Sequence, residues 1–260
     1  MMRKIIAAIV LVISLFVLGF SSYTLYSYFH SIHEAEKTVD DIKDMTKHEP
    51  VLYIDPKTGD LIEDVKEKVT ETEFVNVYED IYNQNPDFVG WLTIPGTNID
   101  YPVVQTPENE QYYLRKDFNK EDNRAGTLFC SADSDVLTPS MNIIIYGHHM
   151  KAGTMFAQLD GYMEEDFYKE HKYIQFNTCT RNATYEVIAA FPTDIYDGTY
   201  KYYGFINGTE EEFNEFIENT KGKTPYQTAD VEYGDEFLTL STCAYHTSGG
   251  RFVVVAKRVV

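Results

Sequence analysis

Residues 236–259 of the chain, with the sequence EFLTLSTCAYHTSGGRFVVVAKRV, give the clearest indication of the fold. In the first part, Leu238 and Leu240 alternate with Thr and Ser up to Cys243, which is the pattern of a β-strand with one buried face. A glycine-containing turn follows, and the run that opens at Arg251 is again rich in Val. The segment therefore predicts a β-hairpin in which Cys243, on the hydroxyl-lined face, comes nearly opposite Arg251, with Cβ atoms about 5 Å apart.

Short runs of the same kind recur along the whole chain after Pro86. They are rich in Val, Ile, Tyr and Phe, and turn residues separate them. Eight such runs indicate a mainly β domain over residues 86–260, either a barrel or a sandwich. The runs cover residues 91–94, 99–105, 127–131, 142–146, 173–178, 185–191, 236–242 and 251–259.

Helical patterns interrupt these runs in few places. Residues 155–159 and 164–170 are compatible with short helices, and residues 210–219 give the strongest pattern. Thr209 precedes that segment and Glu212 lies three residues further on, which is the spacing of a capping box. The side chains expected to be buried are Phe213, Phe216 and Ile217.

Residues 31–85 are predicted to form a helical region before the β domain. Residues 31–47 are charged and are compatible with a stalk or an N-terminal helix, whereas the prolines of residues 48–60 predict a loop. Apolar residues over 74–82 recur at the helical period, and Asn85 followed by proline ends the pattern. We expect this second helix to pack on its own domain rather than to bind a partner.

Residues 1–30 differ from the rest of the chain in hydropathy. Arg3 and Lys4 precede residues 5–29, which carry no charge. The strongly apolar part, residues 5–20, spans roughly 24 Å as a helix, so the residues after it must contribute to crossing a hydrocarbon core about 30 Å thick. The basic flank predicts a single-pass anchor with the N-terminus inside and the rest of the chain outside. A cleaved signal peptide is the alternative, although no Ala-x-Ala site follows the apolar run.

The overall composition excludes several classes of protein. The 260 residues include 41 acidic and 22 basic side chains, for a formal net charge of −19. A chain this acidic is not expected to bind nucleic acid, because phosphate binding needs a basic face. Hydrophobic residues make up 43% of the chain, which excludes a disordered protein. Three cysteines are too few, and odd in number, for a disulfide scaffold.

Cys243 is the candidate nucleophile, because a cysteine that ends a strand on a hydroxyl-lined face is poorly placed as core packing. His148 directly follows the run 142–146 and a glycine, which places it at a rim of the sheet. An imidazole there could raise the thiolate fraction and protonate a leaving amine, and the Arg251 guanidinium could donate to an oxyanion. His246, three residues after Cys243, competes for the acid–base role, and spacing alone does not separate it from His148.

Each of these residues also has a purely structural interpretation. Free cysteine is among the most buried residue types, and Cys130 and Cys179 are interpreted in that way, with a disulfide between them as the alternative. Arg251 by itself would be a solvated charge at a strand end. His148 and His149 have no Cys or His at a recurring ligand spacing, so no metal site is predicted.

Two segments of the chain resemble the signatures of sortases, the cysteine transpeptidases of Gram-positive cell surfaces. The TLSTC run that ends at Cys243, followed by Arg251 in GRFVVVAKR, resembles the segment with the sortase cysteine and arginine. The sequence NIIIYGHHM over residues 142–150 resembles the segment that carries the catalytic histidine, which matches His148.

Three further segments resemble the class B subgroup of that family. They are GWLTIPGTNIDYPVVQ at residues 90–105, YYL at residues 112–114 and GTMF at residues 153–156. The resemblance covers about residues 74–260. Cys130 departs from it, because relatives usually carry a plain hydrophobic residue at that position.

The resemblance implies an eight-stranded sortase-type β-barrel with N-terminal helices, in which Cys243 is the nucleophile and His148 the general acid and base. Arg251 would donate to the oxyanion or the substrate carbonyl. Ser241, on the same face as Cys243, matches a position that contacts the sorting-signal peptide in relatives, and Thr242 beside it is expected to share this substrate-binding role.

The resemblance also implies the substrates. Sortases cleave surface proteins after Thr in a C-terminal pentapeptide sorting signal, form a thioester with the cysteine, and transfer the acyl group to an amine of a peptidoglycan cross-bridge or a pilin Lys. Such proteins, such amines and the lipid around the N-terminal helix are the expected partners. No cofactor or metal is implied.

Two alternatives remain at this point. In papain-like peptidases and related wall hydrolases the cysteine usually precedes the histidine and begins a helix, whereas here His148 precedes Cys243, which ends a strand. A non-catalytic β-domain tethered to the membrane, such as an adhesin or an assembly scaffold, would need none of these three side chains.

Overall fold

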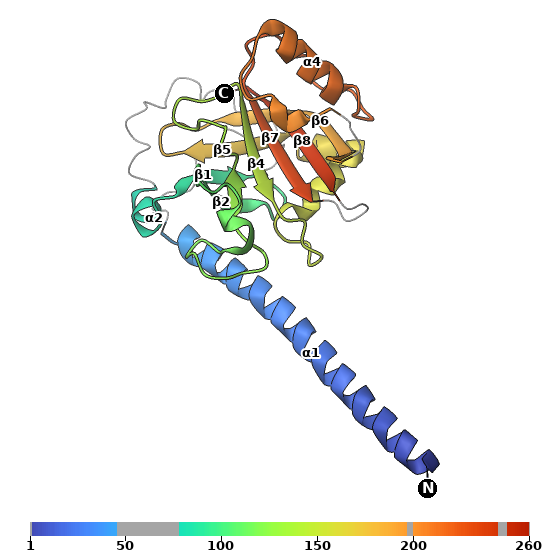
Figure 1. Ribbon diagram of the computed structural model, residues 1–260. Helices are drawn as coiled ribbons and strands as arrows, with labels where there is room; N and C mark the ends of the chain where they lie inside the picture. The colour runs from blue at the N-terminus through green and yellow to red at the C-terminus, as the bar shows by residue number, and fades with distance from the viewer. Residues whose placement is uncertain (1, 46–77, 197–199, 244–248, 260) are drawn as a thin grey trace.

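Eight β-strands close into a barrel in the computed structural model of the chain, which describes residues 2–45, 78–196, 200–243 and 249–259. All eight predicted runs form strands, and of the two architectures expected from the sequence the barrel is the one observed (Figure 1). The strands are β1 (Phe88–Thr93), β2 (Asp100–Val104), β3 (Leu128–Cys130), β4 (Asn142–Gly147), β5 (Tyr173–Thr178), β6 (Thr184–Asp194), β7 (Phe237–Cys243) and β8 (Gly250–Arg258).

The order of the strands around the barrel is β1-β2-β3-β4-β7-β8-β6-β5, and β5 pairs with β1 to close it. Most neighbouring strands are antiparallel, but β2 pairs with β3, and β4 with β7, in parallel. The parallel β4–β7 pair positions the candidate site, because the residues that follow two parallel strands leave the sheet at the same edge.

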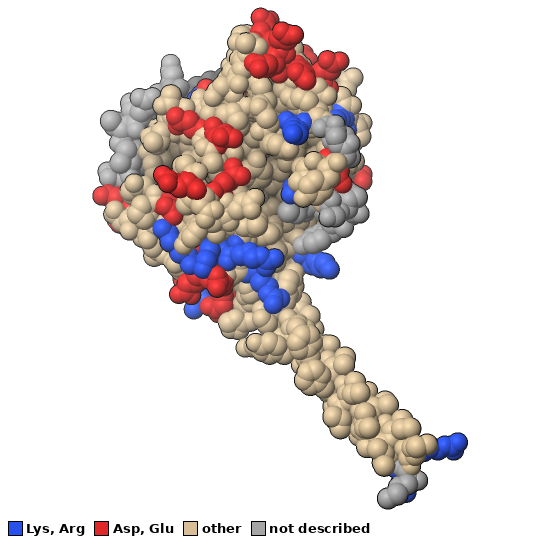
Figure 2. All heavy atoms as spheres, viewed as in Figure 1, with Lys and Arg blue, Asp and Glu red and all other residues tan. Residues whose placement is uncertain are grey.

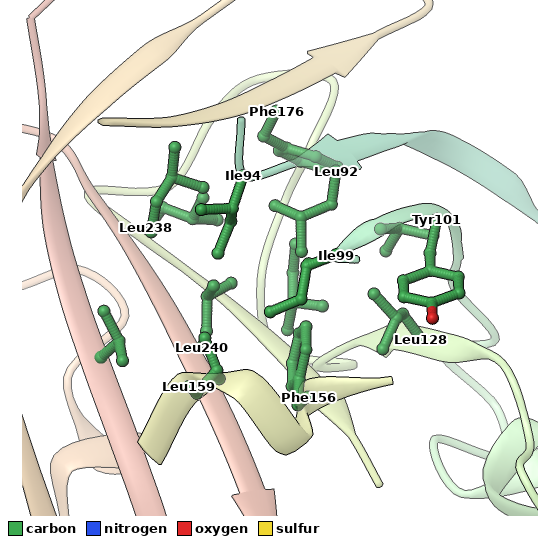
Figure 3. Packing of buried hydrophobic residues seen from close by; sticks show 14 of the residues in the cluster. Leu92, Ile94, Ile99, Tyr101, Leu128, Phe156, Leu159, Phe176, Leu238 and Leu240 are labelled. Atoms are coloured by element: carbon green, nitrogen blue, oxygen red, sulfur yellow. The ribbon is translucent and has the colours of Figure 1, made fainter. Parts of the chain in front are cut away.

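The interior of the barrel is filled by alternate side chains of the strands. Leu238 and Leu240 of β7 lie there fully buried, together with Leu92 of β1 (Figure 3). Phe156 packs against them from the 3₁₀ helix η4 (Phe156–Met163). The alternation predicted for β7 is therefore confirmed, with the leucines on the inner face of the strand.

A second apolar cluster covers the outer face of β6, β7 and β8. It is built on α4 (Glu210–Lys221) and the 3₁₀ helix η5 (Tyr202–Gly204). Phe213 and Phe216 of α4 are buried against Phe237 of β7. The predicted helix is present and extends two residues beyond the predicted end.

The predicted capping box at the start of α4 is also present. The Thr209 side chain accepts a hydrogen bond from the backbone N–H of Glu212, and the Glu212 carboxylate accepts one from the backbone N–H of Thr209 at 2.8 Å. These bonds satisfy backbone donors that the first turn of a helix leaves without intrahelical partners.

The other helices of the barrel domain are short. α3 (Glu165–Glu170) and η4 correspond to the two weaker helical patterns, and η3 (Tyr112–Arg115) and η5 were not predicted. α2 (Glu79–Gln84) ends at Asn85 as predicted, and residues 74–77 of that predicted helix, like the predicted loop over 48–60, lie outside the described residues.

α1 (Met2–Lys43) is one continuous helix that joins the apolar N-terminal segment to the barrel (Figure 1). An 18-residue window of it has a mean hydropathy of 2.7 and no buried residue, so this helix is long and apolar enough to cross a membrane. Its C-terminal turns differ, because Ile32, Ala35 and Ile42 are buried against the barrel domain.

Hydrogen bonds also fix α1 to the domain. The Ser31 hydroxyl donates to Asn123 at 3.0 Å, and the Asn123 amide donates back to the Ser31 carbonyl at 2.9 Å. Residues 31–43 are therefore the docked end of a helix, and of the two interpretations given for residues 31–47 the helix is the one observed over this part.

Charged side chains are distributed unevenly over the molecule. Figure 2 shows Asp and Glu gathered over α4, and Lys and Arg together with further Asp and Glu over the part of the domain beside α1. The projecting length of α1 is free of charge from Ile5 to Phe29.

Candidate active site

The parallel pairing of β4 with β7 brings two of the predicted residues to the same end of the barrel. Gly147, the last residue of β4, pairs with Thr242 of β7. His148 and Cys243 are the next residues along the two strands, so their backbones occupy neighbouring positions, with the strands themselves about 4.8 Å apart. The two segments are separated by more than ninety residues of sequence. A hydrogen bond between the side chains of Thr239 and Asn142, which are 97 residues apart, also joins this pair of strands.

The antiparallel pairing of β7 with β8 adds the third residue. Cys243 pairs directly with Arg251, which confirms the predicted hairpin and its register. The Cys243 side chain and residues 244–248, among them the competing His246, lie outside the described part of the structure. The position of Cys243 is therefore given by its backbone.

His148 is half-buried and is held by a backbone carbonyl. Its Nε2 lies 2.7 Å from the carbonyl oxygen of Leu114, in η3. Because a carbonyl only accepts hydrogen bonds, Nε2 carries the proton and Nδ1 has the free lone pair. Burial lowers the pKa of His148, the bond to Leu114 opposes this, and the nearby Arg115 charge lowers the pKa further, so the net effect favours the neutral imidazole.

The backbone before His148 requires a glycine. A Cβ atom at Gly147 would lie 2.7 Å from the ring of Phe156 and would also clash with Leu128, both of which belong to the buried core. The strand end can therefore approach the interior closely only because this residue has no side chain. The Gly-His pair in the sequence thus has a structural reason.

Arg251 is half-buried at the start of β8 and pairs on its other side with Thr193 of β6. One guanidinium nitrogen, Nη1, donates to the Gly250 carbonyl at 2.8 Å. Within the described ranges no carboxylate forms an ion pair with Arg251, so its remaining N–H groups are available to an acceptor in the adjoining space.

An open groove of about 440 Å³ adjoins these residues. Both His148 and Arg251 line it, as do the predicted substrate-binding residues Ser241 and Thr242. Aromatic, aliphatic and polar residues form the rest of its described wall, together with one glycine: Glu110, Gln111, Leu114, Phe129, Tyr146, Gly147, Ile195, Tyr202 and Tyr203.

Ser241 and Thr242 border the groove but are almost fully buried, each with 1% of its surface exposed. The Ser241 hydroxyl is 2.6 Å from the hydroxyl of Tyr202, in η5, and is therefore already paired. The Thr242 hydroxyl is buried and has no hydrogen-bond partner among the described residues. The two side chains are better suited to shape the floor of the groove than to reach into it.

The environments of the other two cysteines and of His149 make them poor candidates for the roles of Cys243 and His148. Cys130 and Cys179 are both free thiols, so the alternative of a disulfide between them is wrong. Burial raises the pKa of the Cys130 thiol to about 12 and also raises that of Cys179, which makes both poor nucleophiles. His149 points to Asp160, with its Nε2 2.8 Å from the carboxylate, and does not line the groove.

Several groove residues could not be identified from the sequence. Leu114 contributes a backbone carbonyl, which leaves no trace in the residue type, and Glu110 and Tyr202 approach the site only through the folding of separate loops. Among the described residues, no group of three or more His, Cys, Asp or Glu side chains could hold a metal ion.

A protein-family model and individual known proteins that are similar to this chain point to one family. The family model of the sortase domain matches residues 92–259. The chain is 35% identical over 183 residues to Sortase B of Staphylococcus aureus (strain NCTC 8325 / PS 47), a match that covers 69% of this chain and 73% of the relative. It is also 35% identical over 184 residues to Sortase B of Listeria monocytogenes serovar 1/2a, with the same coverage of 69% and 73%.

Solved structures of the same kind superpose on the chain. A Staphylococcus aureus sortase B–substrate complex has a TM-score of 0.71 at 26% identity and covers 88% of this chain and 98% of that one. Sortase B from B. anthracis in complex with AAEK1 has a TM-score of 0.70 at 29% identity, with coverages of 89% and 99%.

Proposed function

Because this chain belongs to the sortase family of cysteine transpeptidases, and within it to the class B sortases, we propose that it cleaves surface proteins after Thr in a C-terminal sorting signal and transfers them to an amine. In this proposal Cys243 is the nucleophile, His148 the acid and base, and Arg251 the oxyanion donor. The observation that carries the assignment is the strand register, which pairs Cys243 with Arg251 and brings the residue after β4, His148, next to Cys243.

His148 acts first as a base. Its Nε2–H is engaged by the Leu114 carbonyl, so the lone pair on Nδ1 is the one available for the thiol proton. Burial keeps the pKa of His148 low, and the neutral form that a base requires is therefore present at pH 7. A free thiol with its ordinary pKa of about 8.5 is mostly protonated at that pH, so proton transfer to His148 is what generates the nucleophilic thiolate.

The Cys243 sulfur then attacks the carbonyl carbon of the Thr residue, and the carbonyl oxygen becomes an oxyanion. The Arg251 guanidinium donates hydrogen bonds to that oxyanion, in a half-buried groove where such bonds are stronger than in water. When the tetrahedral intermediate collapses, the peptide C–N bond breaks and the leaving amine takes the proton from His148. The product is a thioester between Cys243 and the Thr acyl group.

An acceptor amine completes the reaction. It attacks the thioester carbonyl and gives up a proton to His148, and Arg251 again stabilises the oxyanion. The C–S bond breaks, the thiolate of Cys243 recovers its proton from His148, and a new amide bond joins the surface protein to the acceptor. We infer that this acceptor is an amine of a peptidoglycan cross-bridge or a Lys side chain of a pilin.

We propose that the sorting peptide lies in the groove of about 440 Å³. Ser241 and Thr242 would act there by shaping the floor, with Ser241 holding the Tyr202 hydroxyl at 2.6 Å. One of the solved structures that superpose on this chain is a sortase B–substrate complex from Staphylococcus aureus, and the substrate bound by that relative supports the proposal.

We further propose that α1 anchors the enzyme in the membrane with its N-terminus inside and the barrel outside. Ile32 and Ala35 are buried against the barrel, so the catalytic domain would be held at a fixed height above the lipid. A substrate protein retained in the same membrane would then meet the enzyme at a raised effective concentration. The lipid around the apolar part of α1 would be a structural partner.

The proposal is tested with the full chain in detergent micelles. It is incubated with fluorogenic sorting pentapeptides, with and without oligoglycine or a diamino acid, and the products are identified by mass spectrometry. We expect cleavage after Thr, an acyl adduct on Cys243, and an amide product when the amine is present. Cys243→Ala should form no adduct, and Cys179→Ala should react as the wild type does. Cleavage by Cys243→Ala, or no adduct with any peptide of the library, would contradict the proposal.

A further inference from the structure

The groove carries one acidic side chain that the proposed reaction does not use. Among the described residues that line it, Glu110 is the only one with a carboxylate, and Arg251 is the only Lys or Arg. Neither of these two residues forms an ion pair within the described part of the chain. The charge of Glu110 is therefore not neutralised by the guanidinium that serves the reaction.

One carboxylate oxygen of Glu110 is held in place. Its Oε2 accepts hydrogen bonds from the Ser131 hydroxyl at 3.0 Å and from the Ala132 backbone N–H at 2.9 Å. The other oxygen, Oε1, has no hydrogen-bond partner among the described residues. A carboxylate fixed through one oxygen is pre-oriented to accept a charge-assisted hydrogen bond through the other.

Glu110 is also connected to the catalytic histidine through the chain. It lies just before η3, and Leu114 of η3 is the residue whose carbonyl holds His148 at 2.7 Å. The same short segment therefore carries the carboxylate and positions the imidazole. A ligand group bound by Glu110 would be held at a defined place relative to the reacting atoms.

The groove wall beside Glu110 is aromatic. Phe129 and Tyr146 lie at a ring-centroid distance of 5.4 Å, and both line the groove. Burial raises the pKa of the Tyr146 hydroxyl, and the Tyr202 hydroxyl and the Glu110 carboxylate raise it further, so the negative charge of Glu110 acts on this wall. Aromatic faces next to a carboxylate favour a cation over a neutral or anionic group.

We propose that Glu110 is a recognition site for a positively charged amino group in this groove, carried either by a basic side chain of the sorting signal or by the acceptor amine. This inference deepens the proposed function and rests on it. Both sources present the same ammonium chemistry to Oε1, and they enter the reaction at different steps, the sorting signal before the thioester and the acceptor after it.

The sorting signal is tested with pairs of peptides that differ only in Lys against norleucine, at each position other than the scissile Thr. If the sorting signal is the source, the wild type should prefer the Lys peptide at one position by about tenfold in kcat/KM. Glu110→Gln should reduce that ratio to about one. Glu108→Gln, in the same loop but exposed and outside the groove, should keep the wild-type ratio.

The acceptor is tested by the ratio of transfer to hydrolysis of the same thioester. A diamino acid or oligoglycine enters as an ammonium ion and loses one proton to solvent before its nitrogen attacks the thioester, and hydroxylamine serves as a nucleophile that is uncharged at pH 7. If the acceptor is the source, Glu110→Gln should lower the ratio for the charged amine relative to hydroxylamine by about tenfold. Glu108→Gln should again behave as the wild type does.

A change in either ratio supports the proposal and identifies the source of the amino group. The proposal is overturned if Glu110→Gln leaves both ratios unchanged. It is also overturned if the wild type prefers neither Lys over norleucine in the sorting peptide nor the charged amine over hydroxylamine as the acceptor. The wild type alone gives a second measurement should Glu110→Gln fail to fold, since a preference that depends on charge must weaken as salt rises. A wild type that cleaves no sorting peptide at all would contradict the proposed function instead.

Discussion

The interior of the barrel and the groove at its rim are built from the same strands but differ in what their side chains do. In β7, Leu238 and Leu240 are fully buried in the interior, whereas Cys243 ends the strand beside the groove. His148 and Arg251, at the ends of β4 and β8, are half-buried and face open space. The strands thus supply a rigid frame, and the residues at or just past their ends at this rim are not part of the packed core. Substitutions in the interior should cost stability, and substitutions at the rim should cost activity.

The largest effect is expected for His148→Ala. Loss of a general acid and base lowers kcat/KM by about 10²- to 10⁴-fold, and the melting temperature should change little because the side chain is not part of the core. Peptide cleavage assays and thermal unfolding of the same preparations measure both effects.

Two other histidines serve as controls for that variant. His149→Ala should retain most activity, since His149 pairs with Asp160 outside the groove, and we expect the same for His246→Ala. Loss of activity in His246→Ala with a normal rate in His148→Ala would reassign the base.

Leu92→Ala should produce the opposite of His148→Ala, with stability lost and activity retained. Leu92 is fully buried in the interior, on β1 at the far side of the barrel from β7. The cavity left by the truncation should lower the free energy of unfolding by about 2–5 kcal/mol, as measured by urea titration. The rate per folded molecule should stay near that of the wild type at low temperature. An unchanged unfolding free energy would show that the interior is not packed as described.

Arg251→Lys should lower kcat/KM by about 10²-fold, because an ammonium group does not reproduce the planar fork of donors at the oxyanion. Arg258→Lys, at the other end of β8, is the matched control and should have little effect, since Arg258 pairs with Glu236 away from the groove. Near-normal turnover in Arg251→Lys would remove Arg251 from the oxyanion role.

Thr209→Ala is expected to have the smallest effect. It removes the side-chain acceptor of the capping box at α4, which covers the outer face of the barrel. The free energy of unfolding should fall by about 1 kcal/mol in urea titrations, with no change in the rate of peptide cleavage. A loss of activity would mean that α4 communicates with the groove.

The features that the sequence predicts well are local ones. Alternation along a strand and the turn between two neighbouring runs depend on adjacent residues, so the eight strands and the Cys243–Arg251 hairpin are recovered. The capping box of α4 is recovered for the same reason. The family resemblance adds the barrel and the enzyme class, and the comparisons leave no support for a papain-like peptidase or a non-catalytic scaffold.

The features that the sequence misses depend on contacts between distant segments. The parallel pairing of β4 with β7, which makes His148 a neighbour of Cys243, has no local signal. The sequence also has no signal for the hydrogen bond between the Leu114 carbonyl and His148, or for the one between the hydroxyls of Tyr202 and Ser241. The docking of residues 31–43 on the barrel was not predicted either, because the charged residues of this segment outnumber the few apolar ones that make the contact.

The convergence of a sulfur, an imidazole and a guanidinium at one rim is tested most directly by the pH dependence of alkylation at each cysteine, followed by mass spectrometry. We expect Cys243 to be alkylated at lower pH than the other cysteines. Arg251→Met should raise the apparent pKa of the Cys243 thiol, because a nearby positive charge is lost. Cys130 should stay unmodified, since burial raises its pKa to about 12. An identical titration of Cys243 in the wild type, His148→Ala and Arg251→Met would show that the three groups do not converge.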